Sequence, residues 1–283
     1  MEIIQTKRAL DKLDLKAKKS LGQHFLIDRH VLGKVVKAAE LAPDDMVVEV
    51  GPGLGILTRE LAARAGQVTA VEIDRRMISL LEDALRDFAN VRIINGDILE
   101  TNLSFLETGR PYKVVANLPY YIASAVLRLF LEAEHQPELI VTMIQKEVAQ
   151  EIAARSGKLG LLGVAVQVYA RPEIISYVLP SSFYPPPKVS SAILKLVPHS
   201  NLPFGSSDRE SFFRVVKAGF QGKRKQIVNS LSQGLGQGKV NILNLLSRAG
   251  LEPHRRAETL SLEEWLKLWS CYEEMFDEGA GSG

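Results

Sequence analysis

The chain has 283 residues, which is enough for one large domain and a smaller one, because single hydrophobic cores seldom grow beyond roughly 250 residues. Apolar residues make up 46% of the chain and charged residues 24%, a composition that excludes general disorder. The net charge of +2 is too small to identify a nucleic-acid binder, since attraction to phosphate depends on how basic residues cluster.

Cysteine and histidine offer no covalent or metal framework. Cys271 is the only cysteine, which excludes an intramolecular disulfide and a cysteine-based zinc site. The five histidines have no spacing typical of a helical metal pair, and we predict no metal. No apolar run approaches the ~18 residues that span a bilayer, and the N-terminus lacks the pattern of a signal peptide, so we expect a cytoplasmic protein without membrane contact.

The first stretch of the chain is basic. Residues 7–19 hold six basic side chains against two acidic ones, within a predicted N-terminal arm over residues 1–27. Such a run is typical either of a solvated, flexible segment or of one that contacts phosphate. In the second case its candidate RNA-binding residues are Lys18 and Lys19.

Helical and β-branched stretches then alternate. Apolar residues at helical spacing predict a helix between Asp28 and Leu41, with Asp28 as its N-cap. The predicted strands cover residues 46–50, 67–73, 91–94, 112–116 and 139–144, and the predicted helices between them cover 56–65, 75–88 and 122–133. This alternation predicts an α/β fold, a doubly wound Rossmann-like parallel sheet with helices on both faces.

The pattern changes toward the C-terminus. Residues 163–170 and 190–197 are predicted strands that could complete the sheet as an antiparallel edge. Beyond Pro203 the chain shows short helical patterns without a strand signal, at residues 208–220, 223–233, 239–249 and 261–276. We therefore predict a sheet domain over residues 28–202 and a small all-helical domain over residues 203–283.

A glycine-rich turn follows the first predicted strand. Residues 51–55 read GPGLG and lead into a helix, at the edge of a doubly wound sheet where ligands bind. Glycines there let the backbone approach a ligand closely. The dinucleotide fingerprint wants a third glycine where this chain has Ile56, so the turn favours a nucleoside-type cofactor, with a dinucleotide as the alternative.

Carboxylates follow the next two strands. Glu72, at the tip of the second strand, can accept hydrogen bonds from both hydroxyls of a ribose. Asp97, after the third strand, could accept from an adenine amino group, or could serve only as a turn or cap residue. The candidate cofactor-binding residues at the strand ends are Gly51, Gly53, Glu72, Ile73, Asp97, Ile98 and Asn117.

The fourth strand ends in Asn117-Leu118-Pro119-Tyr120. An adenine amino nitrogen is a poor nucleophile because its lone pair is delocalised into the ring. The Asn117 side chain and a backbone carbonyl of the next two residues could each accept one N–H, aiming the lone pair at a sulfonium methyl group. Pro119 fixes the backbone and Tyr120 could stack on the base. The alternative is a plain turn, which asparagine and proline also favour.

These motifs resemble those of the small-subunit ribosomal RNA adenine N6,N6-dimethyltransferases, a family often called KsgA or dimethyladenosine transferase. The resemblance covers nearly the whole chain. It is carried by residues 18–26, by the turn at 51–55 with Leu57 and Thr58, by Glu72, by Gly96 and Asp97, and by residues 117–120, 145–148, 183–189, 220–225 and 256–258.

The resemblance implies S-adenosylmethionine-dependent dimethylation of two adjacent adenosines in the 3′-terminal hairpin loop of 16S rRNA, within an immature 30S subunit, by a protein we expect to be a monomer. It implies further cofactor contacts from His24 and Leu26. It also places the target base beside residues 117–120, with Phe183 on its other face. Many members have asparagine where this chain has His24, although either side chain can donate a hydrogen bond.

The later motifs leave alternatives open. Prolines 185–187 form a stiff segment that could hold Phe183 against an extruded base, or serve as a rigid surface linker. Basic residues near them and in the helical region are candidates for RNA binding, or simply a solvated face: Lys188, Lys223, Arg224 and Lys225.

Two other functions compete with the leading one. A related large-subunit adenine methyltransferase of the macrolide-resistance type is disfavoured by the proline-rich motif and by residues 256–258. A non-catalytic RNA-binding assembly factor or transcription factor is disfavoured by the intact segment 117–120, because a pure binder gains nothing obvious from such a reaction site.

Overall fold

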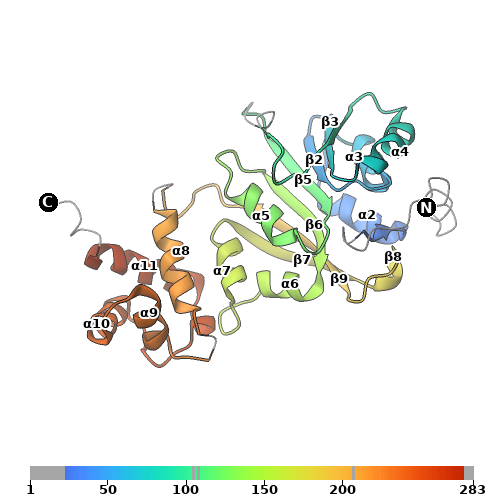
Figure 1. The fold of residues 1–283 in the computed structure, drawn as a ribbon. Helices are drawn as coiled ribbons and strands as arrows, with labels where there is room; N and C mark the ends of the chain where they lie inside the picture. Colours follow the sequence, from blue (N-terminus) through green and yellow to red (C-terminus); the bar gives the residue numbers. More distant parts are fainter. Residues whose placement is uncertain (1–22, 104–105, 107–108, 206–207, 223, 277–283) are drawn as a thin grey trace. The chain divides into compact units, whose positions relative to one another are not determined.

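The computed structural model describes residues 23–103, 106, 109–205, 208–222 and 224–276 (Figure 1). Most of the predicted basic arm, with Lys18 and Lys19, lies outside the described residues, and so does Lys223. The chain forms two compact units. The first comprises Met1–Ala149 and Arg171–Pro198, and the second comprises Gln150–Ala170 and His199–Gly283.

A seven-stranded sheet forms the centre of the first unit, in the order β4-β3-β2-β5-β6-β9-β7. Its strands are β2 (Met46–Val50), β3 (Gln67–Glu72), β4 (Val91–Asn95), β5 (Tyr112–Asn117), β6 (Leu139–Gln145), β7 (Ala170–Val178) and β9 (Ser191–Pro198). The five strands from β2 to β6 pair in parallel, and β9 runs antiparallel to β6, as the sequence predicted. The strand order reverses between β2 and β5, which creates a ligand-binding switch point at their carboxyl ends.

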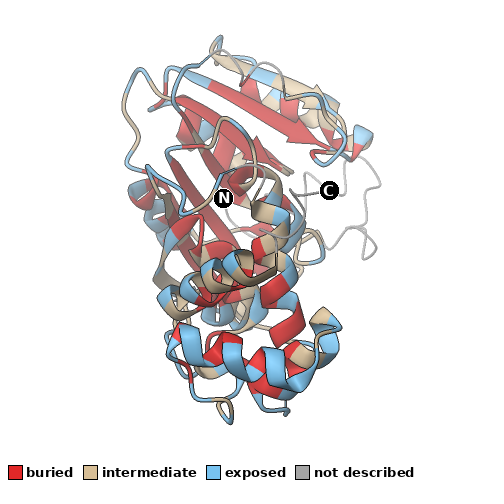
Figure 2. Cartoon of the chain, turned by 90° about the vertical axis from the view of Figure 1, so that its left-hand side faces the viewer, coloured by how far each residue is buried: buried red, intermediate tan, exposed pale blue. Residues whose placement is uncertain are grey.

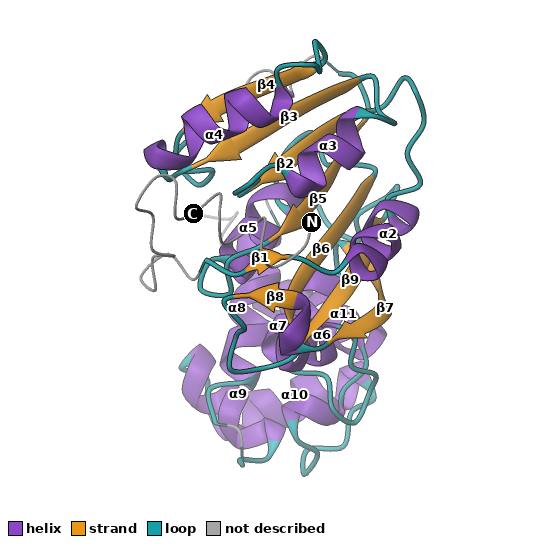
Figure 3. Cartoon of the chain, turned by 90° about the vertical axis from the view of Figure 1, so that its right-hand side faces the viewer, coloured by secondary structure: helices purple, strands orange, loops and turns teal. Residues whose placement is uncertain are grey.

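Helices cover both faces of this sheet (Figure 3). They are α2 (Arg29–Ala38), α3 (Ile56–Ala62), α4 (Arg75–Leu85), α5 (Ala123–Leu131) and α6 (Lys146–Ile152). Helices α3 and α4 connect β2 to β3 and β3 to β4, toward one edge of the sheet, whereas α5 connects β5 to β6, toward the other edge. Because parallel crossovers are right-handed, α3 and α4 lie on one face of the sheet and α5 lies on the opposite face. The predicted cap of α2 is confirmed, since the Asp28 carboxylate accepts from the backbone amides of His30 and Val31.

The main core lies between the sheet and the helices α2 and α3. It is built from strand valines such as Val47, Val68 and Val115, packed against Val35 and Leu61, all of them fully buried. Figure 2 shows the buried residues concentrated along the strands. Each such side chain stabilises the fold by about 1.5–3 kcal/mol through burial, so the strand tips stand on a rigid base.

A short two-stranded sheet ties the N-terminal segment to the proline-rich motif. Strand β1 (Phe25–Leu26) pairs antiparallel with β8 (Phe183–Tyr184). The backbone amide of Ile27 donates to the carbonyl of Ser182 at 2.9 Å. Two segments that lie far apart in the sequence are thereby fixed side by side next to the carboxyl end of β5.

The second unit is mainly helical, and it includes Gln150–Ala170, which the sequence analysis assigned to the sheet domain. Its helices are α7 (Leu161–Gln167), α8 (Arg209–Gly219), α9 (Ile227–Leu235), α10 (Lys239–Ala249) and α11 (Leu262–Phe276). Its core is aromatic: Trp265 is fully buried and stacks on Phe220 with ring centroids 5.4 Å apart. Gly219 lies under the same indole, where an added Cβ would come within 2.3 Å of Trp265 Cη2.

One predicted strand is wrong. Most of the stretch 163–170 belongs to helix α7, and a strand begins only at Ala170. The apolar run suits either element, because Val164 on the helix and Val168 at its C-cap are four residues apart and are both buried. The Gln167 side chain holds the helix end by donating to the carbonyls of Ile152 and Ala154.

Candidate active site at the carboxyl ends of the central strands

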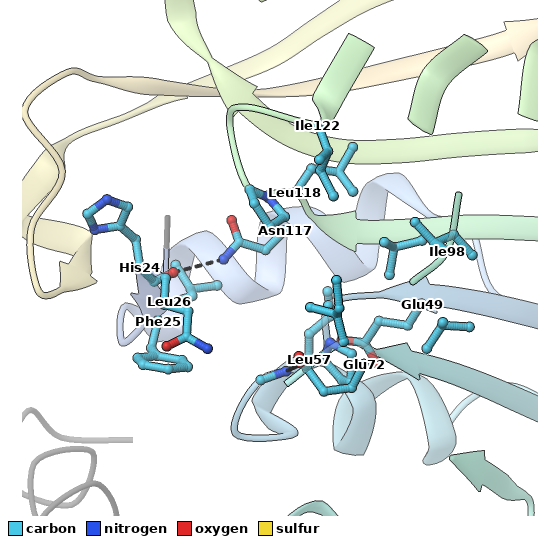
Figure 4. Close-up of a pocket in the computed structure, with 18 of the residues that line it drawn as sticks. His24, Phe25, Leu26, Glu49, Leu57, Glu72, Ile98, Asn117, Leu118 and Ile122 are labelled. Atoms are coloured by element: carbon cyan, nitrogen blue, oxygen red, sulfur yellow. Dashed lines mark hydrogen bonds between the residues drawn. The ribbon is translucent and has the colours of Figure 1, made fainter. Parts of the chain in front are cut away.

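A crevice opens at the switch point, with about 1160 Å³ of empty space, part of it open to solvent (Figure 4). The glycine turn, β1 and the ends of β3, β4 and β5 line it. The crevice brings together all candidate cofactor and catalytic residues: His24, Leu26, Gly51, Gly53, Glu72, Ile73, Asp97, Ile98, Asn117, Leu118, Pro119, Tyr120 and Phe183. Residues up to 160 positions apart in the chain therefore share one site.

The glycine turn needs its glycines for conformational reasons. Gly51, Gly53 and Gly55 have φ values of +68°, +57° and +74°, which side chains with a Cβ rarely adopt. A Cβ on Gly53 would also come within 3.0 Å of the Phe25 ring. The backbone can therefore lie directly against a ligand in the crevice.

The Glu72 carboxylate is fixed by the main chain. Its Oε2 accepts from the Gly53 amide at 3.0 Å and its Oε1 from the Asp74 amide at 2.8 Å. Burial raises the pKa of this carboxyl, and the backbone hydrogen bonds oppose the increase. An acceptor at the tip of β3 is thus held rigidly beside the glycine turn.

Asp74, two residues further on, is stabilised by charge. The Arg76 guanidinium lowers the pKa of this carboxyl to about 2. Gln23 Nε2 donates to Asp74 Oδ2 at 3.1 Å, so the segment before β1 is attached to the tip of β3.

Asp97 both caps a turn and lines the crevice. Its Oδ1 accepts from the Leu99 amide at 2.9 Å, which matches the alternative interpretation of this residue. The carboxylate nevertheless borders the crevice together with the exposed Ile73 and the buried Ile98. Asp97 supplies a hydrogen-bond acceptor, and the two isoleucines supply apolar surface. This combination suits a flat heterocycle that carries an amino group.

The orientation of Asn117 defines the other end of the crevice. Its Nδ2 donates to the backbone carbonyl of His24 at 3.1 Å, so the amide oxygen points away from that carbonyl (Figure 4). The Pro119 carbonyl accepts from the Ile122 amide, which makes the Leu118 carbonyl the candidate for a second acceptor. The tip of β5 therefore offers acceptors suited to an amine.

Aromatic residues surround this tip. Tyr120 Oη lies 2.7 Å from Ser191 Oγ, and its ring centroid lies 6.0 Å from that of His24 at an interplanar angle of 30°. His24 Nδ1 donates to the carbonyl of Pro185 at 2.7 Å, so the imidazole is tied to the proline-rich motif. Phe183 borders the crevice but is only 3% exposed and packs into the core.

None of the described basic candidates is among the residues that line the crevice. Lys188 is exposed in the first unit, and Arg224 and Lys225 are exposed in the second. Lys225 Nζ also donates to Gln233 Oε1 at 2.6 Å. Within the described residues no group of three or more metal-ligating side chains occurs, and none of the helices is both long and apolar enough to cross a membrane.

Sequence reasoning missed several residues that line the crevice, of which three have polar side chains: Gln23, Glu49 and Tyr121. Glu49 could have been recognised from the sequence, because it stands within a run of valines that predicts a buried strand, and a glutamate is rarely fully buried unless it is paired. Tyr121 is 59% exposed, and its position became evident only from the path of the loop after β5.

Known proteins resemble this chain along most of its length. The family model described as ribosomal RNA adenine dimethylase matches residues 14–274. A protein of Dehalococcoides mccartyi named ribosomal RNA small subunit methyltransferase A is 52% identical over 272 residues, covering 95% of this chain and 93% of its own. The protein of that name from Pelotomaculum thermopropionicum is 43% identical over 267 residues, with 90% of each chain covered.

Solved structures agree. The 23S rRNA methyltransferase ErmE is 32% identical with a TM-score of 0.72, covering 87% of this chain and 98% of its own. A dimethyladenosine transferase from Plasmodium falciparum is 26% identical with a TM-score of 0.75, covering 91% and 98%. Because a family model spans nearly the whole chain and relatives are half identical to it, this protein belongs to the ribosomal RNA adenine dimethylase family.

Proposed function

We propose that this protein transfers methyl groups from S-adenosylmethionine to N6 of two adjacent adenosines in the 3′-terminal hairpin loop of 16S rRNA, during assembly of the small ribosomal subunit. The observation that carries the proposal is the orientation of Asn117, whose amide donates to the His24 backbone and leaves its oxygen for an amine. Family membership supports the reaction type, and the names of the most similar relatives support the substrate.

The crevice fits the cofactor. Without a Cβ, Gly53 packs its turn against Phe25 and donates its amide to Glu72, and the carboxylate so held is suited to two ribose hydroxyls. Glu49 Oε2 is buried among the described residues without a hydrogen-bond partner, as expected where a polar or charged ligand completes the site. When bound, the cofactor supplies a methyl group on a positively charged sulfur.

The protein's contribution is to position the nucleophile. Asn117 Oδ1 and the Leu118 carbonyl would each accept one N–H of the adenine amine, which turns its lone pair out of conjugation and toward the methyl group. Tyr120, held by Ser191, would support the base by stacking. No strong general base is needed, because the surplus proton leaves the amine for solvent after transfer.

RNA recognition is assigned to basic residues on several segments. We infer that Lys188 contacts RNA phosphate, and that the helical region over residues 203–283 acts as an RNA-recognition domain with Arg224 and Lys225. Lys18, Lys19 and Lys223 belong to the same hypothesis and lie outside the described residues. The substrate would be an immature 30S subunit in the cytoplasm, methylated by a monomer.

A methyl-transfer assay with two subunits tests the proposal. Labelled S-adenosylmethionine is incubated with the protein and with 30S or 50S subunits from a strain that lacks the modification. We expect label in 16S rRNA alone, as dimethyladenosine, and none in 30S subunits that are already modified. Label in 50S subunits instead would favour the activity named for the 32% identical 23S rRNA methyltransferase. Absence of label with folded protein would contradict both.

A further inference from the structure

The buried carboxyl of Glu49 lines the crevice, and the proposed reaction assigns no specific ligand group to it. Glu49, on β2, is 1% exposed, and its Oε2 has no hydrogen-bond partner among the described residues. The hydroxyl of Thr58, on α3, lies near enough to Glu49 to lower the pKa of its carboxyl, but it is not in hydrogen-bond geometry and likewise has no hydrogen-bond partner among the described residues. Figure 4 shows Glu49 next to Glu72 at the wall of the crevice. A carboxylate without an opposite charge is very unfavourable at such a place, and a neutral carboxyl is tolerated.

The strand order indicates which ligand group lies opposite Glu49. The strands run β4-β3-β2-β5 and end near Asp97, Glu72, Glu49 and Asn117 respectively. The cofactor has the matching order of adenine, ribose, sulfur and methyl group, and the acceptor nitrogen follows. Glu49 pairs in register with Ala70, so it projects from the same face of the sheet as Glu72. Glu49 lies two residues before the level of Glu72, at the inner wall of the crevice, and the central strand β2 places it between the strand suited to the ribose and the strand suited to the amine, where the sulfur would lie.

Among the described residues that line the crevice, no lysine or arginine lies with Glu49 to favour its ionised form. Titratable groups that line the crevice with it are His24, Glu72, Asp97, Tyr120 and Tyr121. Helix α3 presents the uncharged Thr58, while Glu60 on the same helix pairs with Arg64 at the surface. Burial raises the pKa of Glu49 to about 8, Thr58 opposes part of the increase, and the charge of Glu72 adds to it.

We infer that Glu49 senses the charge of the methyl donor: it is protonated in the free protein, ionises when the sulfonium cofactor binds, and is protonated again once the sulfur is neutral. This inference rests on the proposed function and deepens it. Glu49 is thereby a positioning residue that favours the charged donor over the uncharged product, S-adenosylhomocysteine.

The proton and electron balance is simple. On binding, the carboxyl O–H proton of Glu49 goes to solvent and a carboxylate faces the cation. On transfer, the S–CH₃ bond breaks with its electron pair left on sulfur, the nitrogen lone pair forms the N–CH₃ bond, and one N–H proton goes to solvent. The sulfur is then neutral, so the buried carboxylate takes one proton from solvent and its attraction for the product disappears.

Calorimetric titration of the full chain without RNA tests the inference. Binding enthalpies of S-adenosylmethionine and of S-adenosylhomocysteine are measured at pH 7 in two buffers with different ionisation enthalpies, which gives the number of protons released. With a pKa of about 8, about 0.9 proton per site is expected for the donor, and close to none for the product. The ratio of donor affinity to product affinity should rise about 20-fold between pH 6.5 and pH 8.5.

Variants separate Glu49 from other titrating groups. Glu49→Gln keeps the shape of the neutral carboxyl, so it should bind the product normally, bind the donor about tenfold more weakly at pH 8.5, and lose the extra proton release. Glu82→Gln, at an exposed position on α4, should behave like the unmodified protein. Subtracting the Glu49→Gln result removes protons that come from the amino group of the ligand itself.

Each outcome decides a different claim. Equal proton release for donor and product, or release that persists in Glu49→Gln, would overturn the role of Glu49 while leaving the methyltransferase proposal intact. Binding of neither ligand to folded protein would overturn both. The measurement on the unmodified protein needs no variant, so misfolding of Glu49→Gln cannot rescue the inference.

Discussion

The two ends of the crevice are built in different ways. At the cofactor end, Glu72 is held by the amides of Gly53 and Asp74, which are close to it through one turn and one strand tip. At the reaction end, Asn117 is held by the His24 carbonyl, 93 residues away, and Tyr120 by Ser191, 71 residues away. The first end depends on local backbone geometry, whereas the second depends on how distant segments dock.

This difference separates binding from chemistry. Changes at the cofactor end should weaken affinity for the cofactor, because its ligand contacts are fixed within β2 and β3. Changes at the reaction end should slow methyl transfer without much effect on cofactor affinity, because they disturb only the geometry of the amine.

The largest effect is expected for Asn117→Ala. Removing one of two acceptors that align the amine should lower the single-turnover methylation rate by about 10²–10³, while cofactor affinity measured by calorimetry should change less than about threefold. The matched control is Asn201→Ala at an exposed position. Parallel losses in rate and affinity would show that Asn117 mainly supports the crevice and not the amine.

Glu72→Gln tests the cofactor end. A neutral amide cannot accept two charge-assisted hydrogen bonds from backbone amides and also serve a ribose, so cofactor affinity should fall about 10–100-fold. The rate at saturating cofactor should fall much less. Asp83→Asn on α4, where both partners of the surface ion pair are largely exposed, is the control. If saturating cofactor does not restore the methylation rate, Glu72 also affects methyl transfer, and the proposed separation of cofactor binding from chemistry is wrong.

The sequence predicted the cofactor end better than the reaction end for the same physical reason. Strand-tip carboxylates and a glycine turn are local patterns, so Glu72 could be assigned to a ribose from its position alone. The contact between Asn117 and the His24 backbone could not be predicted, because it depends on the pairing of β1 with β8, in which Leu26 pairs with Phe183, 157 positions later.

Local patterns also failed where two elements compete. The apolar run 163–170 suits a buried strand or a buried helix, and in the folded chain Gln167 stabilises the helix end through contacts with the preceding segment. For Glu49, in contrast, the secondary structure was predicted correctly but the environment of the side chain was not. Its strand was predicted with the observed bounds, but the missing partner of its carboxyl is a property of the packed structure.

A smaller effect is expected for Tyr120→Phe. The variant keeps the ring and leaves the fully buried Ser191 hydroxyl without its partner, which costs about 1 kcal/mol in positioning and should lower the methylation rate about fivefold. Cofactor affinity should not change. Tyr177→Phe, at an exposed position on β7, serves as the control. An unchanged rate would mean that packing alone, without the hydroxyl, orients the ring.

The smallest effect concerns the pH dependence of stability at the cofactor end. The Arg76 guanidinium holds the pKa of Asp74 at about 2, below its ordinary value of 3.8, so this ion pair stabilises the folded state above about pH 4 and is lost as the pH falls toward 2. Because Arg76 is partly exposed, the contribution should be about 1 kcal/mol. Asp74→Asn should therefore lower the free energy of unfolding by about that amount at pH 7 and flatten its decline between pH 4 and pH 2, as measured by urea denaturation at each pH. Asp74 also accepts a hydrogen bond from Gln23, so Gln23→Ala is the matched control. If Gln23→Ala lowers the free energy of unfolding by the same amount, the stabilisation comes from the attachment of the N-terminal segment and not from the ion pair. The cofactor end would then depend on contacts between distant segments, as the reaction end does.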